Sequence, residues 1–210
     1  MTHATDRELL RREMRARRRA VPQAIRDAAT TSFASVATRA HLLRPGMRIA
    51  LYVRHGSEAD PSGLMKLARR RGCRVYLPVV RHRSEMEFVR YDEGQSLRGN
   101  RFGILEPVWR AHRRAPVLHL DVVFVPLLAV DDHGTRLGSG QGFYDRRLHH
   151  LREGRRWRRP VLIGVAYECQ RIAYLAPAPW DVPLDGVLTE RNFYVVKTLP
   201  KTQTPQLSRT

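Results

Sequence analysis

Cysteine is nearly absent from this chain, which has only Cys73 and Cys169, far apart and in no Cys-x-x-Cys pairing. Their number and spacing give little support to a disulfide framework or to a thiolate metal site. Long apolar runs are also missing. No stretch approaches the roughly 18 residues of a membrane span, and residues 1–19 are charged where a signal peptide has an apolar core. We therefore expect a cytoplasmic protein with reduced thiols, neither secreted nor bound to a membrane.

Lysine and acidic residues are scarce as well. Of the 38 basic residues 35 are arginine, and only 20 acidic residues oppose them, which leaves a formal net charge of +18. A guanidinium group can bind two phosphate oxygens at once, so phosphate-bearing partners fit this composition. A general bias of arginine over lysine, with a solvated basic surface, would give the same numbers. Net charge bears on solubility and on the steering of ligands, and not on fold.

The length of 210 residues and a hydrophobic content of 42% describe a chain that can bury a core without metal or disulfide staples. We expect a single domain over residues 1–197. Residues 198–210, TLPKTQTPQLSRT, are polar and rich in proline and threonine, so we expect them to form a mobile C-terminal tail.

Apolar periodicity predicts helices that alternate with strands. Two helical patterns, one around Leu9 to Met14 and one from Ile25 to Ala40, are separated at Val21-Pro22, and a third covers residues 61–71. Strand-like runs lie at residues 48–53, 74–80, 86–91, 121–127, 161–166 and 187–189. This order is typical of an α/β fold with a mostly parallel central sheet and helices on both faces, a Rossmann-like three-layer architecture.

The most informative segment is a glycine loop. Gly138, Gly140 and Gly142 follow the apolar strand 122–127 and precede the amphipathic run 144–151, which we expect to be a helix. Glycines let the backbone approach an anion closely, and the free N–H groups at a helix start supply donors, so the loop could hold a phosphate. The loop matches neither of the two common phosphate-binding patterns, and a flexible turn between a strand and a helix would look similar.

Charged residues elsewhere could complete a phosphate site. Arg7 and Arg11 lie one turn apart on one face of the first helix, with Arg15 and Arg18 extending it, although a solvated basic helix paired with Glu8 and Glu13 has the same pattern. A bound polyphosphate generally brings Mg²⁺, which prefers carboxylates. The candidate carboxylates are Asp145, Asp185 and Glu58. Each also has a purely structural explanation: Asp145 as an acid favoured by the helix dipole, Asp185 as a turn residue and Glu58 as an exposed loop acid.

Three segments together resemble the 5-formyltetrahydrofolate cyclo-ligase family, also called 5,10-methenyltetrahydrofolate synthetases. The run Gly134-Thr-Arg-Leu-Gly-Ser-Gly-Gln-Gly-Phe-Tyr-Asp-Arg146 is similar to the family's long glycine signature. Phe102-Gly-Ile-Leu-Glu-Pro107 and Asp181-Val-Pro-Leu-Asp185, which is followed by Val187-Leu-Thr-Glu190, stand in the expected order. The resemblance runs from about Arg7 to Val196.

The resemblance implies an α/β enzyme that uses Mg²⁺ and ATP to convert 5-formyltetrahydrofolate into 5,10-methenyltetrahydrofolate, with ADP and phosphate released. It makes Arg11 and Asp145 the catalytic residues, Asp145 and Asp185 the Mg²⁺ ligands, and Val53, Glu58 and Tyr144 the folate contacts. ATP and its phosphates are assigned to Arg7, Arg11, Arg136, Gly138, Ser139, Gly140, Gln141, Gly142, Phe143 and Tyr144. We expect a monomer with no specific nucleic-acid partner.

Two positions depart from the family pattern. Arg7 stands where the family has lysine, which keeps the charge but on a bulkier, forked group. Phe143 stands where the family usually has tyrosine, so any role that needs a hydroxyl there is lost.

Two other functions fit parts of the sequence. A nucleic-acid-binding module would explain the charge through the arginine-rich segments 11–19, 110–114 and 152–159, but few aromatic residues are interleaved with these arginines and no RNA-binding or zinc-finger pattern is present. An enzyme acting on a sugar phosphate or on coenzyme A could share the architecture, because fold does not settle substrate.

Overall fold

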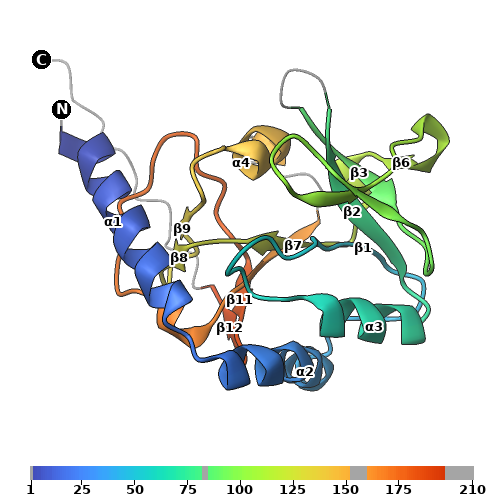
Figure 1. Ribbon diagram of the computed structural model, residues 1–210, viewed down its shortest axis with the longest axis horizontal. Helices are drawn as coiled ribbons and strands as arrows, with labels where there is room; N and C mark the ends of the chain where they lie inside the picture. The colour runs from blue at the N-terminus through green and yellow to red at the C-terminus, as the bar shows by residue number, and fades with distance from the viewer. Residues whose placement is uncertain (1, 82–84, 152–159, 197–210) are drawn as a thin grey trace, which may run out of the picture.

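The computed structural model describes residues 2–81, 85–151 and 160–196, with side chains from Asp6 onward. An eight-stranded sheet forms its centre, with strand order β12-β11-β10-β7-β1-β2-β3-β6 (Figure 1). Its strands are β1 (Arg48–Ala50), β2 (Arg74–Val80), β3 (Met86–Arg90), β6 (Arg114–Ala115), β7 (Val122–Pro126), β10 (Val161–Val165), β11 (Gly186–Leu188) and β12 (Phe193–Val195). Two small hairpins pair β4 (Leu97–Gly99) with β5 (Leu105–Pro107) and β8 (Ala129–Val130) with β9 (Arg136–Leu137).

The helices are α1 (Thr2–Arg19), α2 (Gln23–Arg39), α3 (Ser62–Arg70) and α4 (Phe143–Leu148), with short 3₁₀ turns η2 (Ala111–Arg113), η3 (Val117–His119), η4 (His149–Leu151) and η5 (Glu168–Gln170). Every expected helix and strand is present, and the ends lie within three residues of those expected except in α1, which extends beyond the expected Leu9–Met14 on both sides. The helix expected over residues 144–151 divides into α4 and the 3₁₀ turn η4. No helix within the described ranges is long and apolar enough to cross a membrane.

The parallel core of the sheet is as expected, and both its edges are antiparallel. Strands β2, β1, β7, β10 and β11 run parallel, whereas β3 and β12 pair antiparallel with their neighbours. The expectation of a mostly parallel sheet did not distinguish these edge strands. The chain between β2 and β3 is only five residues long, and a parallel pairing needs a crossover of a dozen residues or more.

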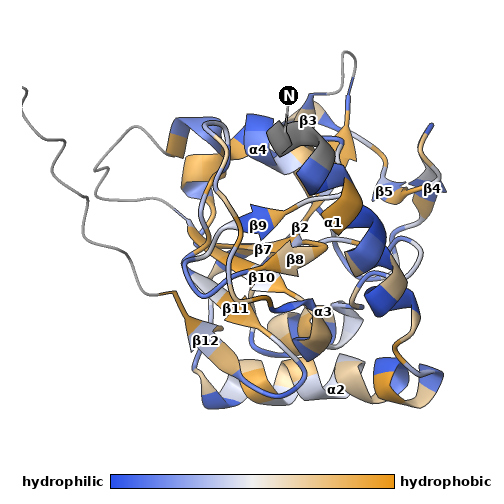
Figure 2. Cartoon of the chain, turned by 90° about the vertical axis from the view of Figure 1, so that its left-hand side faces the viewer, coloured by the Kyte–Doolittle hydropathy of each residue, from blue (hydrophilic) through white to orange (hydrophobic). Residues whose placement is uncertain are grey.

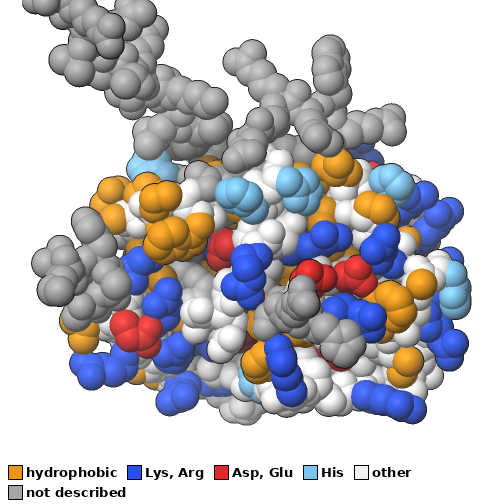
Figure 3. Space-filling view, turned by 90° about the horizontal axis from the view of Figure 1, so that it is seen from above, with side chains coloured by type: hydrophobic (Ala, Val, Ile, Leu, Met, Phe, Trp, Pro, Cys, Tyr) orange, Lys and Arg blue, Asp and Glu red, His pale blue; other side chains and the backbone are white. Residues whose placement is uncertain are grey.

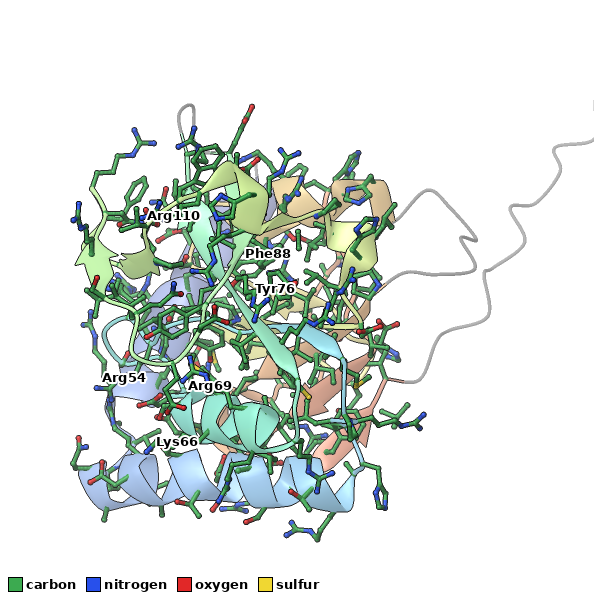
Figure 4. The ribbon with its side chains drawn as sticks, turned by 90° about the vertical axis from the view of Figure 1, so that its right-hand side faces the viewer. Arg54, Lys66, Arg69, Tyr76, Phe88 and Arg110 are labelled. Atoms are coloured by element: carbon green, nitrogen blue, oxygen red, sulfur yellow. The ribbon has the colours of Figure 1, made fainter. Side chains whose placement is uncertain are left out.

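Alternating side chains give the sheet a core on each face. Ile49 and Leu51 pack with α2 and α3 through Phe33 and Leu64, all fully buried. Ala50, which lies between them, points to the opposite face of the sheet, where it packs with residues of β7 and with Leu148 of α4. Figure 4 shows this second side: Tyr76 and Phe88 lie above α3, which carries Lys66 and Arg69. The three-layer expectation is therefore confirmed.

Helix α1 lies outside these layers, against the β8–β9 hairpin (Figure 2). Met14 is fully buried there with Leu128, Leu137 and Leu175 in a third apolar cluster. This packing fixes the arginine-bearing face of α1 beside the segment that follows β9. The expected tail 198–210 and the basic stretch 152–159 lie outside the described residues.

The crossing of α2 over α3 depends on a glycine, and we expect Gly63→Ala to lower the free energy of unfolding by about 1–3 kcal/mol or more. A Cβ at this position would lie 2.0 Å from the backbone oxygen of Thr30, so the two helices would have to separate. Urea unfolding measures the loss. Gly99→Ala is the matched control, because nothing lies within 4 Å of its added Cβ; equal midpoints for the two variants would refute the close crossing.

Candidate active site

Two pockets adjoin at the carboxyl ends of the central strands, where open α/β sheets bind their ligands. The inner pocket is mainly apolar and runs along the sheet edge; among its lining residues are Tyr52, Val53, Pro78, Val80, Met86, Ile104 and Leu127. The outer pocket is charged, and is lined by Arg7, Arg11, Arg136, Gly138, Gly140, Gly142, Asp145, Arg146, His149, Trp180 and Asp181. Arg136, Gly138, Gly142 and Asp145 line both, so the pockets meet at the glycine loop.

The glycine loop connects β9 to α4 and has the conformation its glycines allow. Gly140 has φ +107° and Gly142, just before α4, has φ +65°, values that residues with side chains rarely adopt. Arginines of α1 hold the loop from the other side. The Nε of Arg11 donates to the Gly138 oxygen at 3.3 Å, and Nη2 of Arg15 donates to the Ser139 oxygen at 2.9 Å. The structure thus brings the two sequence-predicted phosphate-binding segments together.

Two arginine–carboxylate pairs line the outer pocket. Arg136 donates to Asp145, and Nη2 of Arg7 lies 2.8 Å from Oδ2 of Asp181. The Nε atoms of both arginines are buried and have no hydrogen-bond partner within the described part of the chain. Burial raises the pKa of Asp145, with a smaller contribution from the Asp181 charge, and the guanidinium of Arg136 opposes this. Each arginine therefore has an unused N–H donor at Nε while its Nη2 is paired with a carboxylate.

Asp185 is not part of this arrangement. Its Oδ2 accepts the Leu162 N–H at 2.8 Å, near the start of β10 and at the amino end of β11. Neither pocket is lined by it. The carboxylate that joins Asp145 is Asp181, four residues earlier, whose position depends on its pairing with Arg7 across 174 residues of sequence. Sequence reasoning missed Asp181 because Asp181 and Asp185 flank one short turn and either could face the loop.

Glu58 extends into the inner pocket from the loop after β1. The Tyr52 hydroxyl donates to the Ala59 oxygen at 2.7 Å and the His55 N–H donates to Oε2 of Glu58 at 3.1 Å, so the loop is held from both ends. Burial raises the pKa of Glu58, while the His55 N–H and the charge of Arg18 act against that rise. Glu58 is thus a partly desolvated carboxylate with a cation nearby. A ligand that presents N–H donors to it would offset the cost of its desolvation.

Tyr144 and Phe143 begin α4 at the junction of the pockets. The Tyr144 hydroxyl is buried with no hydrogen-bond partner among the described residues, and burial raises its pKa together with the nearby charge of Glu58. Burying a hydroxyl without a hydrogen-bond partner costs free energy, and a hydrogen bond to a ligand oxygen could recover that cost. Phe143 packs edge-on against Phe102 at 5.4 Å between ring centroids, so the ring that replaces the family's tyrosine serves as a wall.

Other lining residues were not assigned by sequence. Arg18 donates to Ser57 Oγ at 3.0 Å and to the Leu127 oxygen at 3.3 Å, and its placement beside Glu58 brings it into the inner pocket. Asn100 and Glu106 of the β4–β5 hairpin line the inner pocket, and Trp180 lines the outer one from a loop; none of these segments has a periodic signal. The sequence marked Arg18 only as part of a basic face. The described residues hold no group of three or more metal-ligating His, Cys, Asp or Glu side chains.

The fold defines the class of the protein as an α/β protein, and its two pockets lie where enzymes with open parallel sheets bind their substrates. Comparison with known proteins gives the family. The model of the 5-formyltetrahydrofolate cyclo-ligase family matches residues 3–190, and the chain belongs to that family.

Individual relatives agree with this assignment. The chain is 36% identical to the 5-formyltetrahydrofolate cyclo-ligase of Haemophilus influenzae over 149 residues, 69% of this chain and 76% of the relative. It is 31% identical to that of Mycolicibacterium smegmatis over 187 residues, 87% and 92% of the two chains. The solved structure of Aquifex aeolicus 5,10-methenyltetrahydrofolate synthetase superposes with a TM-score of 0.74 at 25% identity, covering 97% of this chain and 99% of that one.

The resemblance read from the three sequence segments is therefore confirmed, and neither alternative function is supported by these relatives. Figure 3 shows basic side chains scattered over the face seen from above rather than gathered in one stripe, which agrees with a charge distributed over the surface.

The raised pKa of Glu58 predicts how Glu58→Gln changes stability with pH. A carboxyl whose pKa is higher in the folded state than its ordinary value of 4.5 destabilises the fold when it is charged. The variant should therefore unfold at a higher temperature than the parent at neutral pH. The difference should shrink as pH falls through the raised pKa, and vanish below about pH 4, where Glu58 is protonated in both states. Thermal unfolding without ligand, at a series of pH values, measures this; a gain that persisted in acid would contradict it.

Proposed function

We propose that the outer pocket binds the phosphates of ATP and the inner pocket binds 5-formyltetrahydrofolate, in an enzyme that forms 5,10-methenyltetrahydrofolate with release of ADP and phosphate. The observation that carries this assignment is the set of four residues common to both pockets, Arg136, Gly138, Gly142 and Asp145. Because these residues join the pockets, a terminal phosphate bound in the outer pocket would lie next to the end of a ring system bound in the inner one.

The reaction needs this adjacency. An N-formyl group is a poor electrophile, and its oxygen leaves poorly until it is phosphorylated. The formyl oxygen attacks the γ-phosphorus and ADP departs; N10 then attacks the formyl carbon and loses its proton, and phosphate leaves as the ring closes. No protein nucleophile takes part. The chain has to hold the two substrates in line and to neutralise charge on the phosphoryl group in transfer.

Arginines carry most of that neutralisation. Arg11 faces the glycine loop from α1, and Arg7 and Arg136 each have a buried Nε without a protein partner in the described structure, so both can donate to phosphate oxygens without breaking an existing bond at that atom. Arg7 occupies the position of the family's lysine, and its forked group can bind Asp181 and a phosphate together. Backbone N–H groups of residues 138–142 complete the phosphate site.

An apolar groove continues from the outer pocket and suits the nucleoside. It shares Arg7, Arg11 and Trp180 with the outer pocket and is lined beyond them by Leu10, Tyr174, Leu175 and the stretch 176–179. Trp180 and Tyr174 are 62% and 66% exposed, so their ring faces are available for a flat ligand such as a nucleobase to stack on.

The carboxylates fit Mg²⁺ at Asp145 and Asp181. Mg²⁺ binds through one or two carboxylates together with substrate phosphates and water, and these two acids share the outer pocket. When bound, the ion would offset the negative charge of the phosphates. Arg136 and Arg7, each paired with one of these carboxylates through Nη2, would hold the acids in place while their unpartnered Nε atoms donate to phosphate. Asp185, the ligand expected from sequence, has a carboxylate engaged at the other end of the strands.

Glu58, Val53 and Tyr144 are the proposed folate contacts. Glu58 accepts N–H donors of the pterin ring, Val53 packs on it, and the unpartnered Tyr144 hydroxyl donates to an oxygen at the junction of the pockets. The proposal also includes a cytoplasmic monomer. Both cysteines are free thiols.

Arg11→Ala should reduce kcat/KM for ATP by roughly tenfold or more, because a hydrogen bond to a charged phosphate is worth about 1.5–3 kcal/mol. Absorbance of the methenyl product measures the rate. Arg12→Ala is the control on the same helix, since Arg12 is exposed and lines neither pocket. If Arg11→Ala kept the parental kinetics, α1 would be an ordinary solvated helix at this position.

Asp145→Asn and Asp181→Asn should each raise the Mg²⁺ concentration needed for turnover and for thermal stabilisation by ATP, because the amide keeps its size and loses its charge. Asp185→Asn keeps an acceptor for the Leu162 N–H and should leave the Mg²⁺ dependence unchanged. Titration of Mg²⁺ at fixed ATP, followed by the unfolding temperature, gives a readout independent of catalysis. A shifted Mg²⁺ requirement in Asp185→Asn alone would return the metal to the position expected from sequence.

A further inference from the structure

The segment Phe102–Pro107 has so far no chemical role, although it is one of the three segments that carry the family resemblance. It forms the turn and second strand of the β4–β5 hairpin, and Arg98 of β4 pairs with Glu106 of β5. Asn100, Ile104 and Glu106 from this hairpin line the inner pocket. Glu106 therefore brings a second carboxylate, besides Glu58, into the pocket proposed for folate.

The carboxylate of Glu106 is anchored through one oxygen only. Its Oε2 accepts the Val80 N–H at 3.0 Å and the Nδ2–H of Asn100 at 2.9 Å. Asn100 is itself fixed, because its Oδ1 accepts the N–H groups of Phe102 and Ile104 at 2.9 and 3.1 Å. No hydrogen bond to Oε1 occurs within the described part of the chain, and Oε1 is not among the buried atoms that lack a partner. The side chain thus holds one open acceptor in a fixed place.

An anchor alone does not require a carboxylate. The carbonyl oxygen of a glutamine would accept the same two donors, and a charge beside Pro78, Val80, Met86 and Ile104 costs free energy of desolvation. A charged acceptor in apolar surroundings is useful where a ligand presents an N–H group to it. This is the condition under which the desolvation is offset.

The strand order gives the relative position of the groups. Along the sheet edge β7 is followed by β1 and then β2. Glu58 lies in the loop after β1, and Glu106 of β5 accepts the N–H of Val80 at the end of β2, so each carboxylate stands beside one of two neighbouring strands of the sheet. The glycine loop adjoins the pocket from the side of β7, through the β8–β9 hairpin. A flat bicyclic ring that begins at the phosphate junction can reach both carboxylates.

We propose that Glu106 is a specificity-determining residue of the folate site, in which Oε1 accepts an N–H of the 2-amino-4-oxo-tetrahydropteridine ring while Glu58 accepts another. This rests on the proposed function and adds a second acceptor to the same site. Such a ring presents N–H donors on N3, on N8 and on the exocyclic amine. These are more donors than a single carboxylate can accept. A ring that lacks the matching donor would leave Oε1 desolvated and unpaired, and would be rejected for that reason.

The test is Glu106→Gln, with 5-formyltetrahydrofolate binding measured by calorimetry in the absence of ATP. The glutamine oxygen keeps the bonds from Val80 and Asn100 and turns an N–H₂ group into the place of Oε1, so a donor meets the donor of the ring. We expect the dissociation constant and KM for 5-formyltetrahydrofolate to rise roughly tenfold or more, because hydrogen bonds to charged groups are worth about 1.5–3 kcal/mol. The dissociation constant for ATP and the unfolding temperature should stay at the parental values.

Glu93→Gln is the matched control, since Glu93 precedes the same hairpin and its side chain is 82% exposed. Glu106→Asp is the second variant; it keeps the charge but withdraws it by one methylene, and should also raise KM for folate. Parental folate affinity in either folded variant overturns the role of Glu106, as does a fall in kcat with unchanged affinity. A parent protein that neither binds 5-formyltetrahydrofolate nor forms methenyl product would instead refute the proposed function.

Discussion

The pairing of Arg136 with Asp145 is the constraint on which the site depends. The guanidinium is 3% exposed and the carboxylate 19%, and both line the two pockets. Arg136 belongs to β9 and Asp145 to α4, so the pair closes the glycine loop between them into a fixed arc. A buried charge pair is weak evidence for stability, because desolvation can exceed attraction. Its value here is geometric: it holds a cation and an acid at the point where the two pockets meet.

The second requirement is the contact of α1 with segments far along the chain. The helix lies outside the layers that cover the sheet. It is held by the burial of Met14 against Leu128, Leu137 and Leu175. That apolar contact sets the rotation of the helix, and the rotation directs Arg7 to Asp181 and Arg11 to Gly138. The charged face is therefore positioned by the apolar face behind it.

The sequence predicts the regular part of this fold well, because apolar periodicity and glycine spacing are local signals. It placed the central strands, three of the helices within a few residues, and the glycine loop beside Arg11. It did not distinguish the antiparallel edges, where the deciding factor was the short connection between β2 and β3. It took Asp185 from the family resemblance as the carboxylate to join Asp145, whereas the structure brings Asp181 into the outer pocket through its pairing with Arg7, a contact between the two ends of the fold. Glu106 had no local signal, since its neighbour Val80 belongs to a different strand.

The order of the chain has a consequence for how the enzyme is made. During synthesis α1 leaves the ribosome first, yet its packing partners Leu128, Leu137 and Leu175 follow more than a hundred residues later. Contacts of such sequence separation form late and slow the folding of a domain. The nascent chain can therefore pair β1 with β2 and cover them with α2 and α3 while α1, with its arginines, still lacks a surface on which to dock. The outer pocket, which α1 lines together with the glycine loop and Asp181, is therefore complete only when nearly all of these segments have been translated.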